Sequence, residues 1–256
     1  MALGRREKGG GRADAAAATR DQQNLLQDHL LQKSRGYATT RGSPLQQRCA
    51  SASKGDPLSH RADYYLAPQS PWTYLGHERF AAMAAQAGAV VRVLPVDLGR
   101  IFPVSGGLPL QKRAPQRQAY RLVELRRFSE HLGIPLNVQP KYFPVAGDDA
   151  ARLIIAVDLH DGTQAALTIA GAILRAVWAQ ERNIADAQVL GQLLAENGLQ
   201  PQRLEESRSA PVQQRYDANT QEAADLGVFG APTYAVDGEL FWGQDRLEFV
   251  QRRLQS

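Results

Sequence analysis

The chain has 256 residues, of which 43% are hydrophobic and one, Cys49, is a cysteine, so it can bury one or two cores but cannot form an intrachain disulfide or a cysteine metal cluster. The net charge is +4, yet the first sixty residues hold about ten Lys and Arg against about five acids, which leaves the remainder nearly neutral. Nothing in this distribution calls for a nucleic-acid partner, and no apolar run approaches the length of a membrane span.

Residues 1–60 are rich in Gly, Ala, Gln, Arg and Ser and almost lack aromatic and β-branched side chains. This composition predicts a disordered basic tail, within which residues 22–31 could form a transient helix. The tail faintly resembles a transit peptide, but a solvated tail explains the composition without targeting. It has no apolar segment of the kind that a secretory signal needs, so we predict a cytoplasmic protein.

The ordered part is predicted to begin near residue 61 with a strand over 63–67, a helix over 72–87 and a strand over 90–96. Two strands joined by one helix predict a right-handed, parallel βαβ unit. Ser70 and Pro71 fall between the first strand and the helix. Active sites of α/β proteins lie at that end of a strand.

The middle of the chain is predicted to be helical. Residues 102–115 form a Gly/Pro-rich stretch that predicts a loop, and prolines interrupt the connection over 134–144. Apolar spacing predicts helices over residues 116–132, 149–159, 162–180, 186–196, 201–207 and 211–226. In the first of these helices, we expect an inward-facing set comprising Tyr120, Val123, Leu125 and Phe128.

The C-terminal part predicts a β-hairpin followed by a helix. Strands are expected over 233–236 and 239–242 around the turn residues Asp237-Gly238, with a helix over 246–254. Pro232 stands at the start of a strand, where a proline is tolerated at an edge or for a purpose, and an X-Pro bond is the one that adopts cis at low cost. A cis bond would turn the backbone of Ala231 outward.

A βαβ half and a ββα half joined through helices make up a thioredoxin-like sheet with a large all-helical insertion. We therefore predict an α/β protein in which residues 61–98 and 227–256 form the thioredoxin-like domain. Residues 99–226 are predicted to form the helical insertion.

Three motifs in this chain resemble those of the 2-hydroxychromene-2-carboxylate isomerases, which belong with the kappa-class glutathione transferases and are relatives of DsbA. The motifs are Ser70-Pro-Trp-Thr-Tyr-Leu, Gly227-Val-Phe-Gly-Ala-Pro-Thr and Leu240-Phe-Trp-Gly-Gln-Asp-Arg246. The resemblance extends over about residues 62–254. It implies a DsbA/kappa-type fold, glutathione as cofactor, a small aromatic substrate from aromatic-compound catabolism, and a homodimer.

The resemblance also implies roles for individual residues. Ser70 would be the catalytic residue, whose hydroxyl donates to the glutathione sulfur and lowers the pKa of its thiol. The backbone of Ala231 beside a cis Pro232 would pair with the cysteinyl amide. Gln244 and Asp245 would hold the γ-glutamyl end.

Arg117 stands where the family has a lysine, and it keeps a charge that can bind a carboxylate through two hydrogen bonds. The chain departs from the family pattern at Ala67, Gly107 and Ala146, where the family has an acid and two polar residues. The resemblance implies that these losses cluster where the substrate and the glycyl end of glutathione would lie, so they put the identity of the substrate in question more than the thiol site.

Simpler structural interpretations stand beside these roles. Ser70 and Asp245 could be plain helix N-caps. Trp178 and Trp242 are expected in the core, with a place in the wall of the pocket as the alternative for either one. A solvated helix face is expected for Arg121, Arg126 and Arg127. The five histidines show no metal-ligand spacing, and we assign them no role.

Three functions are consistent with the sequence. The favoured one is a glutathione-dependent isomerase that acts by reversible thiolate addition, or a kappa-like glutathione transferase. A DsbA-like thiol oxidoreductase is disfavoured because Ser70 and Thr73 occupy both cysteine positions. The third is a non-catalytic thioredoxin-fold binding protein, which thiol-dependent turnover would exclude.

Overall fold

The computed structural model describes residues 60–256, which lie in one compact unit. The predicted disordered tail and transient helix fall outside these residues. No helix in the described part of the chain is both long and apolar enough to cross a membrane.

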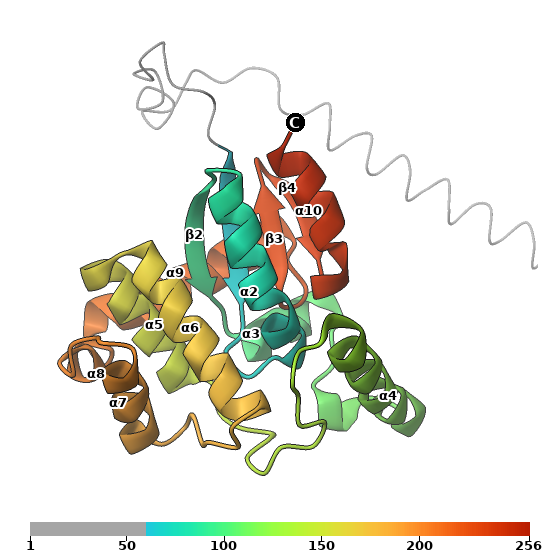
Figure 1. Cartoon of the computed structure of the whole chain (residues 1–256), viewed down its shortest axis with the longest axis horizontal. Helices are drawn as coiled ribbons and strands as arrows, with labels where there is room; N and C mark the ends of the chain where they lie inside the picture. The colour runs from blue at the N-terminus through green and yellow to red at the C-terminus, as the bar shows by residue number, and fades with distance from the viewer. Residues whose placement is uncertain (1–59) are drawn as a thin grey trace, which may run out of the picture. The chain divides into compact units, whose positions relative to one another are not determined.

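The centre of this unit is a four-stranded mixed sheet in the order β2-β1-β3-β4 (Figure 1). The strands are β1 (Arg61–Leu66), β2 (Val90–Pro95), β3 (Thr233–Val236) and β4 (Glu239–Trp242). β1 and β2 are parallel, whereas β3 is antiparallel to both of its neighbours. The predicted βαβ and ββα halves are therefore confirmed, and they share a single sheet.

The hairpin between β3 and β4 turns at Asp237 and Gly238, which have φ angles of 50° and 90°. Positive φ at both central residues is the geometry that matches the twist of the flanking strands, and Asp-Gly adopts it readily. The predicted hairpin is confirmed at the predicted residues.

Helices connect and cover the sheet. After β1 comes α2 (Pro71–Gln86), and after β2 comes α3 (Leu98–Ser105). The chain continues through η2 (Leu110–Lys112), α4 (Pro115–Leu132), α5 (Asp148–Asp161), α6 (Thr163–Trp178), α7 (Ala187–Glu196), α8 (Arg203–Glu206) and α9 (Ala210–Leu226). It ends with η3 (Gln244–Arg246) and α10 (Leu247–Leu254).

Alternating residues of β1 face different helices. Tyr64 packs with Phe80 of α2 and Val250 of α10 in the larger hydrophobic cluster. Tyr65 belongs to a smaller cluster on the other face, with residues of α3 and α9. Both tyrosines are fully buried, so the sheet is covered on both sides.

The larger cluster extends beyond the sheet. Ile154 of α5, Ile173 of α6 and Leu193 of α7 belong to the same continuous core as Tyr64 and Phe80. In Figure 1, α5 to α8 lie on one side of the lower end of α2, and α4 lies on the other. We propose that residues 61–98 with 227–256, and residues 99–226, are two domains that share this core.

Two predictions about the middle of the chain were wrong. Part of the predicted loop is the helix α3, which begins after Asp97; the Asp97 side chain accepts a hydrogen bond of 2.7 Å from the N–H of Gly99. In α4, Leu125 is buried as predicted, but Tyr120 is 58% exposed and Val123 is also exposed. The apolar side chains of α4 therefore do not all face the core.

Candidate active site

Ser70 lies at the N-terminus of α2, directly after the turn that ends β1. Its N–H donates to the carbonyl oxygen of Ala67 (3.0 Å), and its side chain accepts a hydrogen bond of 3.2 Å from the N–H of Thr73. Pro71 occupies the first turn of the helix, where a missing N–H costs nothing. Ser70 is therefore the N-cap of α2, and it remains 8% exposed.

The turn before β3 brings Ala231 next to this serine. The Ala231-Pro232 peptide bond is cis, as predicted. The Ser70 hydroxyl donates a hydrogen bond of 3.3 Å to the carbonyl oxygen of Ala231. The N–H of Ala231 donates to no group within residues 60–256. One backbone donor thus lies close to one hydroxyl.

Gln244 follows β4 and packs against α2. It is only 2% exposed, and its Oε1 accepts a hydrogen bond of 2.8 Å from Arg79. Gly76 permits this packing, because a Cβ at that position would lie 2.9 Å from the Cβ of Gln244. The Gln244 side-chain oxygen is thus held by α2, and the buried Nε2 has no partner in the described part of the chain.

Asp245 is half-exposed and forms an ion pair of 2.7 Å with the neighbouring Arg246. The prediction that it caps the last helix was wrong. Gln244–Arg246 form a short 3-10 helix, and Arg246 is the residue at the N-cap of α10, without a side-chain capping hydrogen bond. The carboxylate of Asp245 is therefore not used by the helix.

Two cavities of about 700 and 690 Å³ lie between α4 and the segments that carry Ser70, Ala231 and Gln244. Both are lined by Trp72, Arg113, Arg117, Arg121, Ala231 and Trp242, so together they form one cleft. Ser70 lines the first cavity, and Gln244 and Asp245 line the second. Of the six predicted site residues, Pro232 alone is absent from both linings; it is buried behind Ala231.

The family departures fall in two places. Ala67 and Gly107 line the first cavity, where a Cβ at Gly107 would lie 2.4 Å from the ring of Phe102. Ala146 does not line the cleft; it lines a separate cavity beside Asp148 and Asp149. The expectation that all three departures cluster near the ligand therefore fails for Ala146.

Aromatic side chains form part of the first cavity's lining. Phe229 and Trp242 pack with ring centroids 4.7 Å apart, and Trp242 is 52% exposed. A Cβ at Gly230 would lie 2.5 Å from Nε1 of Trp242, so this glycine lets the indole rest on the backbone. Trp178 is buried as predicted, but the prediction of Trp242 in the core was wrong.

Arg121 was also predicted wrongly. It is not on a solvated face but half-buried, with its guanidinium over the rings of Phe143 (5.1 Å) and Trp178 (5.8 Å). Burial, and after it the nearby positive charge of Arg113, lower the pKa of Arg121 to about 10. The signal for this residue was its four-residue spacing from Arg117, which places both arginines on one face of α4.

No histidine in the described part of the chain lines the cleft. His77 is buried, and its Nε2 donates to the carbonyl oxygen of Leu167 (2.9 Å) while its Nδ1 lies 3.1 Å from the hydroxyl of Tyr64. Among residues 60–256, no group of His, Cys, Asp and Glu could hold a metal ion.

The fold and site define the thioredoxin class: a helix N-terminus faces a cis-proline turn at the end of a mixed four-stranded sheet. In agreement, the family model of the DSBA-like thioredoxin domain matches residues 63–255. The 2-hydroxychromene-2-carboxylate isomerase of Pseudomonas putida is 30% identical over 192 residues, which cover 74% of this chain and 91% of that protein. The chain belongs to the 2-hydroxychromene-2-carboxylate isomerase family within the DsbA-like thioredoxin-domain proteins.

Two further comparisons agree with this assignment. Glutathione S-transferase kappa 1 of Caenorhabditis elegans is 26% identical over 214 residues, which cover 78% of this chain and 93% of that protein. A solved structure of a 2-hydroxychromene-2-carboxylate isomerase superposes with a TM-score of 0.65 at 25% identity, over 76% of this chain and 94% of the other. The relatives are thus isomerases and a glutathione transferase.

Proposed function

We propose that this protein is a glutathione-dependent isomerase of 2-hydroxychromene-2-carboxylate or a similar aromatic-catabolism intermediate. The observation that carries the proposal is the hydrogen bond between the Ser70 hydroxyl and the backbone of Ala231, two residues that line the same cleft. When bound, glutathione would supply a thiolate that adds reversibly to a conjugated carbon of the substrate. A kappa-like transferase activity of the same cleft is the alternative, because that relative is similar over nearly its whole length.

The residues of the cleft fit glutathione at several points. The free N–H of Ala231 can donate to the cysteinyl backbone of the tripeptide, and Ser70 can donate to its sulfur from a helix N-terminus, where negative charge is favoured. Asp245 offers a carboxylate to the γ-glutamyl amine. Arg117, which is exposed and pairs with no acid within residues 60–256, can bind the glycyl carboxylate.

Gln244 supports this site in a different manner from the one predicted. Its side-chain oxygen is already engaged by Arg79, so we propose that it fixes the position of Asp245 and the backbone of η3 rather than binding glutathione through that oxygen. A homodimer, which the family resemblance implies, and a cytoplasmic location both remain predictions.

The test is the ionisation of bound glutathione. Ser70→Ala should raise the pKa of the bound thiol by on the order of one to two pH units, because a hydrogen bond to a charged group contributes roughly 1.5 to 3 kcal/mol. The measurement is thiolate absorbance against pH, with activity followed in parallel.

A matched control separates this effect from helix capping. Asp186 caps α7, where its side chain accepts a hydrogen bond of 2.8 Å from the N–H of Gln188. Asp186→Ala and Ser70→Ala should both cost about 1 kcal/mol of stability through loss of a cap. Only Ser70→Ala should move the thiol titration; identical titrations for Ser70→Ala and the wild type would falsify the catalytic role of this serine.

A further inference from the structure

The cleft contains cationic groups that the glutathione site does not use. Arg113 and Arg121 line both cavities, whereas no Asp or Glu among residues 60–256 lines the first one. Within residues 60–256, neither arginine forms an ion pair with an acidic side chain, although Arg127 on the same helix pairs with Glu124 at 2.8 Å. Arg113 and Arg121 therefore remain without an assigned partner once Arg117 is given to the glycyl carboxylate and Asp245 to the γ-glutamyl amine.

Arg121 is the more constrained of the two. Its guanidinium is half-buried against Phe143 and Trp178, which limits its orientations and removes water from part of it. A partly desolvated cation without a partner binds an anion more strongly than a solvated one does. The lowered pKa of Arg121, caused by burial and then by Arg113, is the opposite of what a carboxylate neighbour would produce.

The same cavity offers an apolar surface. Phe102, Phe229 and Trp242 line it together with Arg121, and the Phe229-Trp242 pair is about half exposed. A ligand with a flat aromatic ring and one carboxylate could place its ring on this pair while its carboxylate reaches the guanidinium. Aromatic contact and a bidentate ion pair would then fix its orientation relative to Ser70.

We propose that Arg121, assisted by Arg113, binds the carboxylate of an aromatic substrate and thereby sets the specificity of the cleft for anionic rather than neutral aromatic compounds. This inference rests on the proposed function, because it names the residue that reads the substrate. It assigns Arg117 and Arg121, one helical turn apart on α4, to two different groups: the glycyl carboxylate of glutathione and the carboxylate of the substrate.

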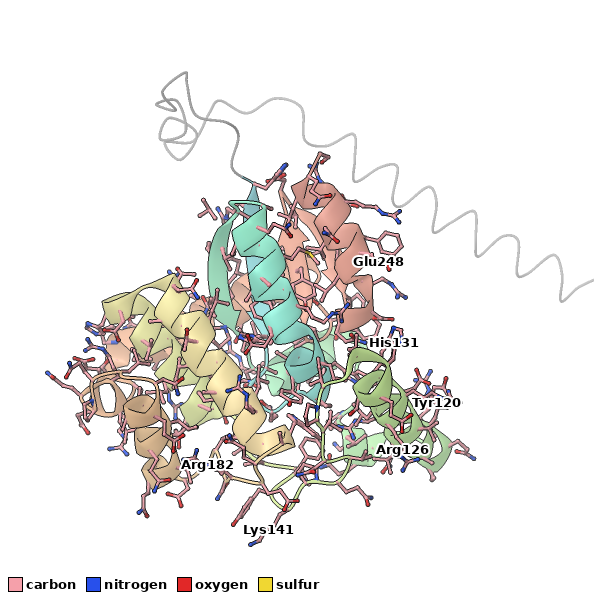
Figure 2. The ribbon with its side chains drawn as sticks, viewed as in Figure 1. Tyr120, Arg126, His131, Lys141, Arg182 and Glu248 are labelled. Carbon is pink, nitrogen blue, oxygen red and sulfur yellow. The ribbon has the colours of Figure 1, made fainter. Side chains whose placement is uncertain are left out.

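The test uses two probes of the same shape, 1-naphthoate and 1-naphthamide, titrated calorimetrically into the full chain without glutathione. The wild type should bind naphthoate at least about tenfold more tightly than the neutral amide. Arg121→Gln should abolish this preference, and Arg121→Lys should retain part of it. Arg126→Gln is the matched control, since Arg126 is exposed on the same helix (Figure 2) and should change nothing.

A second titration, with S-methylglutathione, separates the two carboxylate sites. Arg117→Gln should weaken this ligand and Arg121→Gln should not. The proposal is overturned if the wild type does not bind naphthoate, if it binds both probes equally, or if Arg121→Gln behaves like Arg126→Gln. It is also overturned if Arg121→Gln weakens S-methylglutathione as much as Arg117→Gln does. None of these outcomes depends on the Ser70 titration, so the two proposals fail separately.

Discussion

The hydroxyl of Ser70 donates to the carbonyl oxygen of Ala231 across 161 residues of sequence. Oγ of Ser70 also accepts a hydrogen bond from the N–H of Thr73, so the one proton of the hydroxyl is directed at the cis-proline turn. A ligand sulfur that accepts the hydrogen bond from the Ser70 hydroxyl must displace the Ala231 carbonyl oxygen, which accepts it in this structure. Ligand binding and the geometry of this contact are therefore coupled.

A cysteine at this position should react with glutathione disulfide. Ser70→Cys places a thiol at a helix N-terminus, which lowers its pKa, and its thiolate can attack the disulfide, form a mixed disulfide and release one glutathione. The expected result is a mass increase of one glutathione that a reductant reverses. The wild type, with Cys49 alone, gives the background, and Ser209→Cys at the start of α9 serves as a control that should react more slowly. Equal labelling of the two variants would count against a glutathione site at Ser70.

Gly76 and Gly191 should respond oppositely to alanine. Both lie in helices, but a Cβ at Gly76 would lie 2.6 Å from the hydroxyl of Tyr234 and 2.9 Å from the Cβ of Gln244, whereas at Gly191 the nearest atom is 3.8 Å away. Gly76→Ala should lower the free energy of unfolding by about 1 to 3 kcal/mol through overpacking. Gly191→Ala should raise it by roughly 0.5 to 1 kcal/mol. Denaturant unfolding measures both, and a stabilised Gly76→Ala variant would show that α2 and η3 pack less closely.

His77 should make stability depend on pH near neutrality. Burial lowers the pKa of His77 in the folded state, with Glu78 opposing the shift, so the unfolded chain binds the proton more readily. The free energy of unfolding should therefore fall as the pH drops below about 6.5, by at most about 1.4 kcal/mol per pH unit. His77→Gln should flatten this dependence between pH 7 and 5 while lowering stability at pH 8.

His131 is the control for that prediction, since it is exposed near the end of α4 (Figure 2). His131→Gln should keep the slope of the wild type. If His77→Gln keeps the slope as well, the buried imidazole is not its source.

Gly230→Ala should move the indole of Trp242, because the added methyl group would lie 2.5 Å from its Nε1. We expect a changed tryptophan emission spectrum and weaker binding of 1-naphthoate by several-fold, with the affinity for S-methylglutathione nearly unchanged. Trp242→Phe should also change the emission spectrum, because it removes this indole, but it should keep most of the naphthoate affinity, because an aromatic face remains. Unchanged naphthoate binding in Gly230→Ala would remove Trp242 from the substrate surface.

The parts of this fold that were predictable from the sequence have local causes. Asp237-Gly238 adopts positive φ readily, and Pro232 before an apolar run signals a special turn, so the hairpin and the cis bond were both anticipated. Ser-Pro combines an N-cap with a proline in the first turn, so the position of Ser70 at a helix N-terminus was predictable, whereas its catalytic role was implied by the family resemblance.

The errors arose where burial depends on distant elements. Hydrophobicity alone does not tell whether a side chain faces the core or a cleft, so Tyr120 and Trp242 were placed inside. The charge of Arg121 suggested solvent, although its stem and guanidinium pack on rings supplied by other segments. The helix α3 was missed because Pro103, which lies inside it, suggested a break.

The continuous core that joins β1 and α2 to α5, α6 and α7 limits how this protein can be rebuilt. Grafting a different helical segment between β2 and β3 would remove side chains such as Ile154 and Ile173, which cover the inner surface of the sheet. Such a chimaera would need new side chains on β1 and α2 as well. New substrate ranges are therefore reached more readily by substitutions in α4 and in the turn after α9 than by exchange of the whole helical segment.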